Sequence, residues 1–224
     1  MSTRSLSRPR ALLLDLDGTL ADTAPDLAGA VNKLRTDRGL EPVPLATLTP
    51  HASAGARALI GAGFGLQPGD DGYAALLAGF LDNYEAAIAV KTTLFGGIPD
   101  MLARVRLAGV VWGVVTNKPM RFTDRLVPLL ELGSPACVVS GDTTPYAKPH
   151  PAPLLKAAEL LGLAPSDCWY VGDDLRDIQA GKAAGMVTIA AAWGYCGTVE
   201  PQSWDADAIA GSPLNLLAMV QDSL

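Results

Sequence analysis

Histidine and cysteine are scarce in this chain, which has two histidines and three cysteines among 224 residues. A structural zinc site needs about four such ligands at short spacing, but here they are scattered singly. Neither His51 nor His150 has an evident partner, so we interpret both as structural or peripheral. Isolated cysteines are typical of a reducing compartment, where thiols behave as small buried hydrophobes. The sequence therefore predicts a cytoplasmic protein without structural zinc or a disulfide framework.

Charged residues are also few, at 18% of the chain against roughly 25% in typical domains, while hydrophobic residues reach 49%. Such a chain can build a substantial core. The formal net charge of −6 excludes a nucleic-acid partner, because binding that polyanion requires clustered Lys and Arg. The apolar run at residues 11–14 is too short for a signal peptide or a membrane span. We therefore expect neither nucleic acid nor a membrane as a partner.

Short apolar runs alternate with helical patterns along most of the chain, which predicts an α/β fold with a doubly wound parallel sheet. Right-handed crossovers would connect the strands. The predicted strands are residues 11–14, 110–115, 137–139, 169–171 and 187–190. The predicted helices between them are residues 98–107, 121–132, 152–161 and 175–184.

One segment interrupts this alternation, because it has helical periods and no convincing strand. The helical periods are residues 27–35, 54–60 and 73–87. Turn signals stand at both edges of the segment. We predict that residues 22–91 form an inserted helical cap and that residues 1–21 and 92–224 form the core.

Three polar residues stand at the carboxyl ends of predicted strands: Asp15, Thr116 and Asp173. In doubly wound sheets, ligands bind beyond these ends, at the point where the strand order reverses. Residues about 160 positions apart in the sequence should therefore converge on one crevice.

The first motif is Asp15-Leu16-Asp17-Gly18-Thr19. Side chains two apart on an extended backbone point the same way, and Gly18 permits a tight turn. One carboxylate, kept ionised by a cation, can attack phosphorus, and the other can protonate the leaving oxygen. We therefore take Asp15 and Asp17 as the catalytic pair.

A second and a third motif offer groups that bind phosphate. Thr116 and Asn117 end a strand and precede a helix, which supplies a hydroxyl and backbone amides. Lys148 stands just before a predicted helix, with Pro149 and Pro151 stiffening the approach, and could neutralise both nucleophile and phosphate. Taken alone, each motif favours a simpler interpretation: a helix-capping residue for Thr116 and an exposed, solubilising side chain for Lys148.

The fourth motif places Asp173, Asp174 and Asp177 at the start of a helix. Oxygen-only ligands select a hard cation such as Mg²⁺. With Asp15 and Asp17 in the same crevice, unit charges about 4 Å apart would repel by about 4 kcal/mol at an effective dielectric near 20. Such a cluster requires a cation, and the cation together with Lys148 would let a dianionic phosphate approach.

Arg57 is the candidate for substrate selection in the cap, because it follows the small residues Ala54, Gly55 and Ala56. Its cationic side chain could bind an anionic part of the substrate. An ordinary surface arginine on a helix is the alternative interpretation.

The four motifs, in this order and spacing, resemble the haloacid dehalogenase superfamily, with a cap of its first type. Within it, Asp22-Thr23-Ala24-Pro25-Asp26-Leu27, Thr116-Asn117-Lys118-Pro119 and the run from Gly172 to Ile178 are similar to the phosphoglycolate phosphatase group. Features such as Gly55-Ala56-Arg57-Ala58, Trp112-Gly113-Val114-Val115 and Trp193-Gly194-Tyr195 resemble bacterial N-acetylmuramic acid 6-phosphate phosphatases. Ala52-Ser53-Ala54-Gly55 departs from relatives that often have paired glycines there.

The resemblance implies a Mg²⁺-dependent phosphatase that acts on a small phosphorylated metabolite through a phosphoaspartate. Asp15 would be the nucleophile, and Asp17 would be the acid and then the base. Thr116, the Asn117 amide and Lys148 would hold the phosphoryl group. The metal ligands would be Asp15, the carbonyl of Asp17 and Asp173, with Asp174 and Asp177 acting through hydrogen bonds or metal-bound water.

N-acetylmuramic acid 6-phosphate and 2-phosphoglycolate are the substrates that this resemblance suggests. A sugar-phosphate phosphomutase uses the same residues and stays open as an alternative. A dehalogenase would leave Asp17 without a role. A phospho-accepting receiver domain, a non-enzymatic alternative, also combines clustered Asp with Thr and Lys, but receivers lack the cap and the Asp-x-Asp-Gly-Thr motif.

Overall fold

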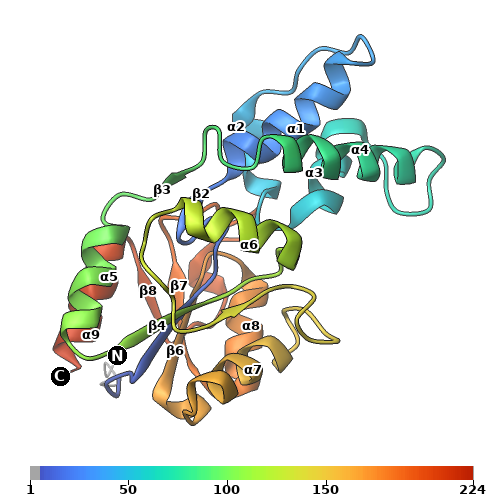
Figure 1. The fold of residues 1–224 in the computed structure, drawn as a ribbon. Coiled ribbons are helices and arrows are strands. Elements are labelled where there is room, and N and C mark those ends of the chain that lie inside the picture. Colours follow the sequence, from blue (N-terminus) through green and yellow to red (C-terminus); the bar gives the residue numbers. More distant parts are fainter. Residues whose placement is uncertain (1–5, 224) are drawn as a thin grey trace.

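The computed structural model describes residues 6–223, and its centre is a six-stranded parallel sheet (Figure 1). The strand order is β5-β4-β1-β6-β7-β8, so the first strand lies in the middle. Its residue Ala11 pairs with Val111 on one side and Cys168 on the other. The strands are β1 (Ala11–Leu14), β4 (Val111–Val115), β5 (Val138–Val139), β6 (Cys168–Gly172), β7 (Val187–Ala191) and β8 (Ala208–Ala210).

Helices cover both faces of the sheet because side chains of β1 alternate between them. Leu12 and Leu14 share one buried cluster with residues of α5, α6 and α9, whereas Leu13 packs with residues of α7 and α8. These helices are α5 (Ile98–Leu107), α6 (Met120–Leu129), α7 (Ala152–Leu161), α8 (Leu175–Ala184) and α9 (Pro213–Asp222). Short 3₁₀ turns are η2 (Pro165–Asp167) and η3 (Pro201–Ser203). The doubly wound α/β prediction is confirmed.

The segment between β1 and α5 is helical and lies beyond the carboxyl ends of the strands (Figure 1). Its helices are α1 (Ala24–Thr36), α2 (Leu45–Leu48), the 3₁₀ turn η1 (Thr49–His51), α3 (Gly55–Phe64) and α4 (Tyr73–Ala86). Helices α1, α3 and α4 pack on one another. At the base of the segment, β2 (Ala21–Asp22) pairs antiparallel with β3 (Thr93–Leu94). The boundaries 22 and 91 stay a prediction.

The C-terminal β8 and α9 were not predicted from the sequence. β8 has only three residues and lies at the edge of the sheet, so its apolar run is too short to distinguish from a loop. A signal for α9 was available, because the Ser212 hydroxyl accepts a hydrogen bond from the amide of Asn215 and Pro213 opens the helix. Within residues 6–223, no helix has both the length and the apolar character needed to cross a membrane.

Candidate active site

Asp15, Thr116 and Asp173 lie together at the carboxyl edge of the sheet, directly after β1, β4 and β6. These three strands are neighbours, and all three side chains are buried. The amide of Asp15 donates to Val171 O at 2.9 Å, which fixes the first of them against β6. The structure thus brings these three residues together, as their positions at the ends of strands predict.

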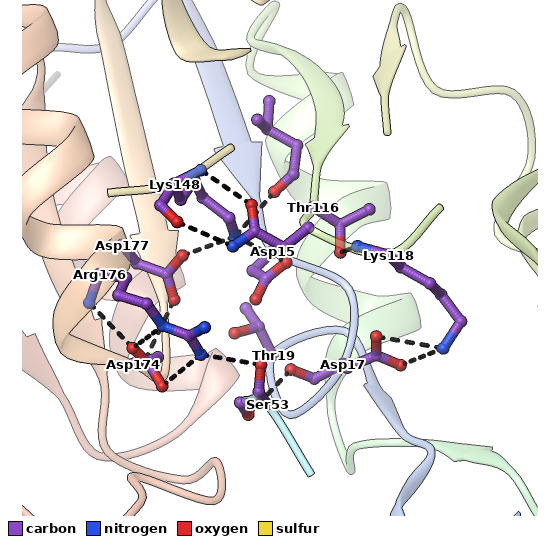
Figure 2. Close-up of polar contacts among 12 residues, drawn as sticks. Asp15, Asp17, Thr19, Ser53, Thr116, Lys118, Lys148, Asp174, Arg176 and Asp177 are labelled. Atoms are coloured by element: carbon purple, nitrogen blue, oxygen red, sulfur yellow. Dashed lines mark hydrogen bonds and ion pairs between the residues drawn. The ribbon is translucent and has the colours of Figure 1, made fainter. Parts of the chain in front are cut away.

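Lys148 is the buried cation of this edge, and Figure 2 shows its ammonium group between two carboxylates. Its Nζ lies 3.0 Å from Asp15 Oδ1 and 2.6 Å from Asp177 Oδ1, and it also donates to the Tyr170 hydroxyl at 2.8 Å. Burial alone would lower the pKa of Lys148, but the charges of Asp15 and Asp177 outweigh it and raise this pKa above its ordinary value. The lysine therefore stays charged at the floor of the site.

The side chain of Asn117 fixes Lys148 rather than pointing at a ligand. Asn117 Nδ2 donates to the Lys148 carbonyl at 3.0 Å, and the Lys148 amide donates to Asn117 Oδ1 at 2.9 Å. This pair of bonds joins the loop after β4 to the loop before α7. The side chain of Asn117 is therefore engaged, and its backbone amide is the group left for a phosphate.

The carboxylate of Asp15 is buried and incompletely bonded. Burial raises its pKa to about 6, with Lys148 opposing the rise and Asp177 adding to it. Within residues 6–223, Asp15 Oδ1 accepts no hydrogen bond of standard geometry, although Lys148 Nζ is 3.0 Å away. A nucleophile needs such an oxygen, held beside a cation and not consumed by hydrogen bonds.

Asp173 is fully buried and receives hydrogen bonds from three directions. Oδ1 accepts from Thr19 Oγ1 at 2.9 Å, and Oδ2 accepts from Ser53 Oγ at 2.8 Å and from the Tyr195 amide at 3.0 Å. Burial and the charges of Asp15 and Asp177 raise the pKa of Asp173 well above its ordinary value. Gly18 makes room for this carboxylate, because a Cβ there would lie 2.1 Å from Asp173 Oδ2 and its φ of 84° favours glycine.

Three carboxylates fit a divalent cation. Asp15, Asp173 and Asp177 are all buried, and each offers an oxygen within 4.8 Å of the others. A cation would offset the mutual repulsion of these carboxylates and would give the unbonded Asp15 Oδ1 a partner. A set of ligands that are all oxygen atoms suits Mg²⁺. The carboxylate of Asp177 belongs to this cluster, although the sequence analysis placed it outside the ligand set. Asp17 would contribute only its carbonyl, because its carboxylate is turned away.

That carboxylate of Asp17 points toward Lys118 (Figure 2). Lys118 Nζ lies 2.9 Å from Asp17 Oδ1 and 3.2 Å from Oδ2, and Thr23 Oγ1 donates to Oδ1 at 2.6 Å. Lys118 is buried, and its Nζ lies 4.5 Å from the ring centroid of Tyr84 on α4. Sequence reasoning assigned Lys118 no role, although this lysine stands two residues after Thr116.

Asp174 caps α8 and holds Arg176. The carboxylate accepts from the Arg176 amide at 2.9 Å and from Arg176 Nε and Nη2 at 2.8 Å. Burial would raise the pKa of Asp174, but the hydrogen bonds and charge of Arg176 lower it below its ordinary value. Arg176 Nη2 also reaches the Ser53 carbonyl at 2.9 Å. Asp174 therefore orients an arginine and does not face the cation site.

Most of the charged groups described above line one cavity of about 360 Å³, whereas Asp173 lies beneath it and is not among the lining residues. Helices α1, α4 and α6 complete its wall with apolar side chains. Its polar lining includes Asp15, Asp17, Thr116, Asn117, Lys118, Lys148, Asp174, Arg176 and Asp177, and its apolar lining includes Leu27, Ala56, Phe80, Leu81, Tyr84 and Phe122.

The structure does not bring Arg57 to this cavity, because its side chain is exposed on α3 and is not among the lining residues. His51 and His150 do not line the cavity either. The ring of His150 stacks on Tyr146 at 4.4 Å between centroids.

The family model of haloacid dehalogenase-like hydrolases matches residues 9–185, which include every carboxylate and lysine of the candidate site described above. The chain belongs to this family. A phosphoglycolate phosphatase from Xanthomonas campestris is 46% identical over 212 residues, covering 93% of this chain and 95% of the relative. An N-acetylmuramic acid 6-phosphate phosphatase from Pseudomonas aeruginosa is 40% identical over 219 residues and covers 97% of each chain.

Among solved structures, the fold is similar to that of a predicted phosphoglycolate phosphatase from Haemophilus somnus. The TM-score is 0.86 at 24% identity, and the match covers 96% of this chain and all of the other. At that identity the match shows the fold alone. The predicted superfamily and the prediction of a hydrolytic enzyme are confirmed by these relatives.

Proposed function

We propose that this haloacid dehalogenase-like hydrolase is a Mg²⁺-dependent phosphatase that hydrolyses a small phosphate monoester through a phosphoaspartate on Asp15. One observation carries the proposal: Asp15 Oδ1 is buried at the floor of the cavity, lies 3.0 Å from Lys148 Nζ, and accepts no hydrogen bond of standard geometry within the described chain. The Asp15 carboxylate is thus held beside a cation without being consumed by hydrogen bonds, as a nucleophile that attacks phosphorus requires.

The surrounding residues can perform the remaining steps. The Thr116 hydroxyl, the Asn117 amide and Lys148 hold the transferring phosphoryl group in line with Asp15. Asp17 gives a proton to the leaving oxygen and then takes one from the water that cleaves the phosphoaspartate. A bound Mg²⁺, held by Asp15, Asp173 and the Asp17 carbonyl with Asp177 beside them, would offset the negative charge of both phosphate and carboxylates.

The relatives suggest the substrate. Their names give 2-phosphoglycolate and N-acetylmuramic acid 6-phosphate. The cavity of about 360 Å³ and the apolar side chains of Leu27, Phe80 and Leu81 favour the sugar phosphate, because 2-phosphoglycolate, a short anion with one carboxylate and one phosphate, would leave that surface uncovered. All three cysteines are free thiols, which supports a cytoplasmic location.

The test is a comparison of phosphate release from N-acetylmuramic acid 6-phosphate, 2-phosphoglycolate and common hexose phosphates, with Mg²⁺ and with EDTA. Asp15→Asn should abolish release from all of them, because an amide does not form the phosphoenzyme. Undiminished turnover in Asp15→Asn would rule out the mechanism. Conversion of a hexose phosphate to its isomer without phosphate release would instead support the phosphomutase alternative.

A further inference from the structure

The loop that precedes α3 touches the candidate metal site. Ser53, between η1 and α3, donates its hydroxyl to Asp173 Oδ2 at 2.8 Å. Ser53 Oγ also lies 3.5 Å from the Asp17 carbonyl oxygen (Figure 2). Asp173 and the Asp17 carbonyl are two of the groups to which the proposed function assigns the cation. A residue of the predicted cap segment therefore reaches the ligand set itself.

The hydrogen bonds of Asp173 determine which of its oxygens can bind a cation. An ionised carboxylate has about four acceptor positions, two on each oxygen. Ser53 and the Tyr195 amide fill both positions of Oδ2, whereas Thr19 fills one position of Oδ1. One position on Oδ1 stays available for a cation, and Oδ2 is the oxygen that holds the carboxylate in place.

Close contacts with the backbone at Gly18 and Gly194 also hold Asp173 in its orientation. A Cβ at Gly194 would lie 2.3 Å from Asp173 Cβ, just as one at Gly18 would meet the carboxylate. Thr19, Gly18 and Gly194 belong to loops next to β1 and β7 of the sheet. Among the described residues, the side-chain donors to Asp173 are Thr19, which lies just after β1, and Ser53, which comes from the predicted cap at residues 22–91.

The backbone of Ser53 is held to the sheet independently of its hydroxyl. Arg176 Nη2 donates to the Ser53 carbonyl at 2.9 Å, while Asp174 holds the guanidinium group of Arg176 through two bonds of 2.8 Å. Helix α8 thus docks the loop and places the Ser53 hydroxyl on Asp173. Removing the hydroxyl alone should leave this docking contact in place.

On the basis of the proposed function, we propose that Ser53 is a positioning residue for the divalent cation. Its hydroxyl orients Asp173 for metal binding, so the affinity for the cation depends on the loop being docked. Hydrogen-bonding partners of ligating carboxylates typically change metal affinity by about 10–100-fold when they are removed. By thermodynamic linkage, a bound cation in turn favours the docked loop.

The first test is calorimetric titration of the full-length protein with Mg²⁺ in the absence of substrate. Ser53→Ala should raise the Kd by about tenfold or more, whereas Ser53→Thr, which keeps the hydroxyl, should retain most of the affinity. Arg57→Ala, an exposed position on the following helix, is the matched control and should bind as the wild type does. Thermal unfolding in EDTA checks that each variant is folded.

The second test is hydrogen exchange of residues 52–55 with and without Mg²⁺. The cation should slow exchange there in the wild type and much less in Ser53→Ala. A Kd that is unchanged or lower in Ser53→Ala would overturn the inference, and so would a Ser53→Thr variant as weak as Ser53→Ala. These results leave the proposed function intact; a wild-type protein that binds Mg²⁺ but releases no phosphate contradicts the proposed function instead.

Discussion

The sheet side and the helical side of the cavity are built from different kinds of contact. On the sheet side, Lys148 Nζ lies 3.0 Å from Asp15 Oδ1 and 2.6 Å from Asp177 Oδ1. On the other side, Leu27 of α1 and Leu81 of α4 offer only apolar surface. The first side can bind and transfer a phosphoryl group, which every substrate of the proposed reaction shares. The helical side can select by shape among the organic groups to which the phosphoryl group is attached. Under the proposed function, selectivity would depend on the helical side, and the chemistry would depend on the sheet side together with the Ser53 contact to Asp173.

The largest expected effect tests the chemical side of this comparison. Asp17→Asn should reduce kcat/KM on an alkyl phosphate by about 10²–10⁴-fold, because an amide replaces the group that transfers the proton. The loss should be much smaller on p-nitrophenyl phosphate, whose leaving group needs no proton. Thr23→Val, which removes only the 2.6 Å bond to Asp17 Oδ1, serves as the milder control. Equal losses on both substrates would show that Asp17 has another role.

The residues on the sheet side could be predicted because their positions follow from local rules. A buried strand that ends in Asp15 or Asp173 places that residue at the edge of a parallel sheet, whatever the rest of the chain does. The contacts of Lys118 and Ser53 could not be predicted in this way. Lys118 meets Asp17 across 101 positions and Ser53 meets Asp173 across 120. The Ser53 pair depends on how the helical segment packs on the sheet, and the Lys118 pair depends on side-chain orientation in the loops after β4 and β1. Motif spacing encodes neither.

The second prediction concerns the charge cluster without metal. The pKa of Asp15 rises from 3.8 to about 6 on folding. Between these pH values, the folded protein holds a proton that the unfolded chain releases, so the free energy of unfolding falls as the pH rises. Asp15 should contribute up to about 3 kcal/mol to that decline. Asp173, whose pKa is also raised, should extend the decline to higher pH.

Urea unfolding in EDTA between pH 4 and 7 measures this decline. Asp15→Asn should show a shallower one, because it carries no titrating carboxyl group at that position. Adding Mg²⁺ at pH 7 should stabilise the wild type more than Asp15→Asn. A variant that followed the wild-type curve at every pH would show that the cluster does not hold Asp15 in an unfavourable ionised state.

The third prediction tests the selective side. Leu81 and Leu77 are both half-buried on α4, but only Leu81 lines the cavity. Leu81→Ala should change the ratio of kcat/KM between a bulky sugar phosphate and 2-phosphoglycolate by about tenfold, a typical contribution of apolar pocket contacts. Leu77→Ala should change the stability of the protein and leave this ratio unaltered. Similar ratios in both variants would place substrate selection elsewhere.

The smallest expected effect concerns Arg57, for which the sequence pattern and the structure give different expectations. The pattern suggests that its cationic side chain binds an anionic part of the substrate. In the structure its side chain is exposed on α3, and it does not line the cavity. The geometry therefore predicts that Arg57→Ala changes kcat/KM by less than about twofold on every substrate, because exposed charges are largely screened by water and salt. A selective loss on 2-phosphoglycolate, with its extra carboxylate, would show instead that α3 moves Arg57 toward the bound substrate.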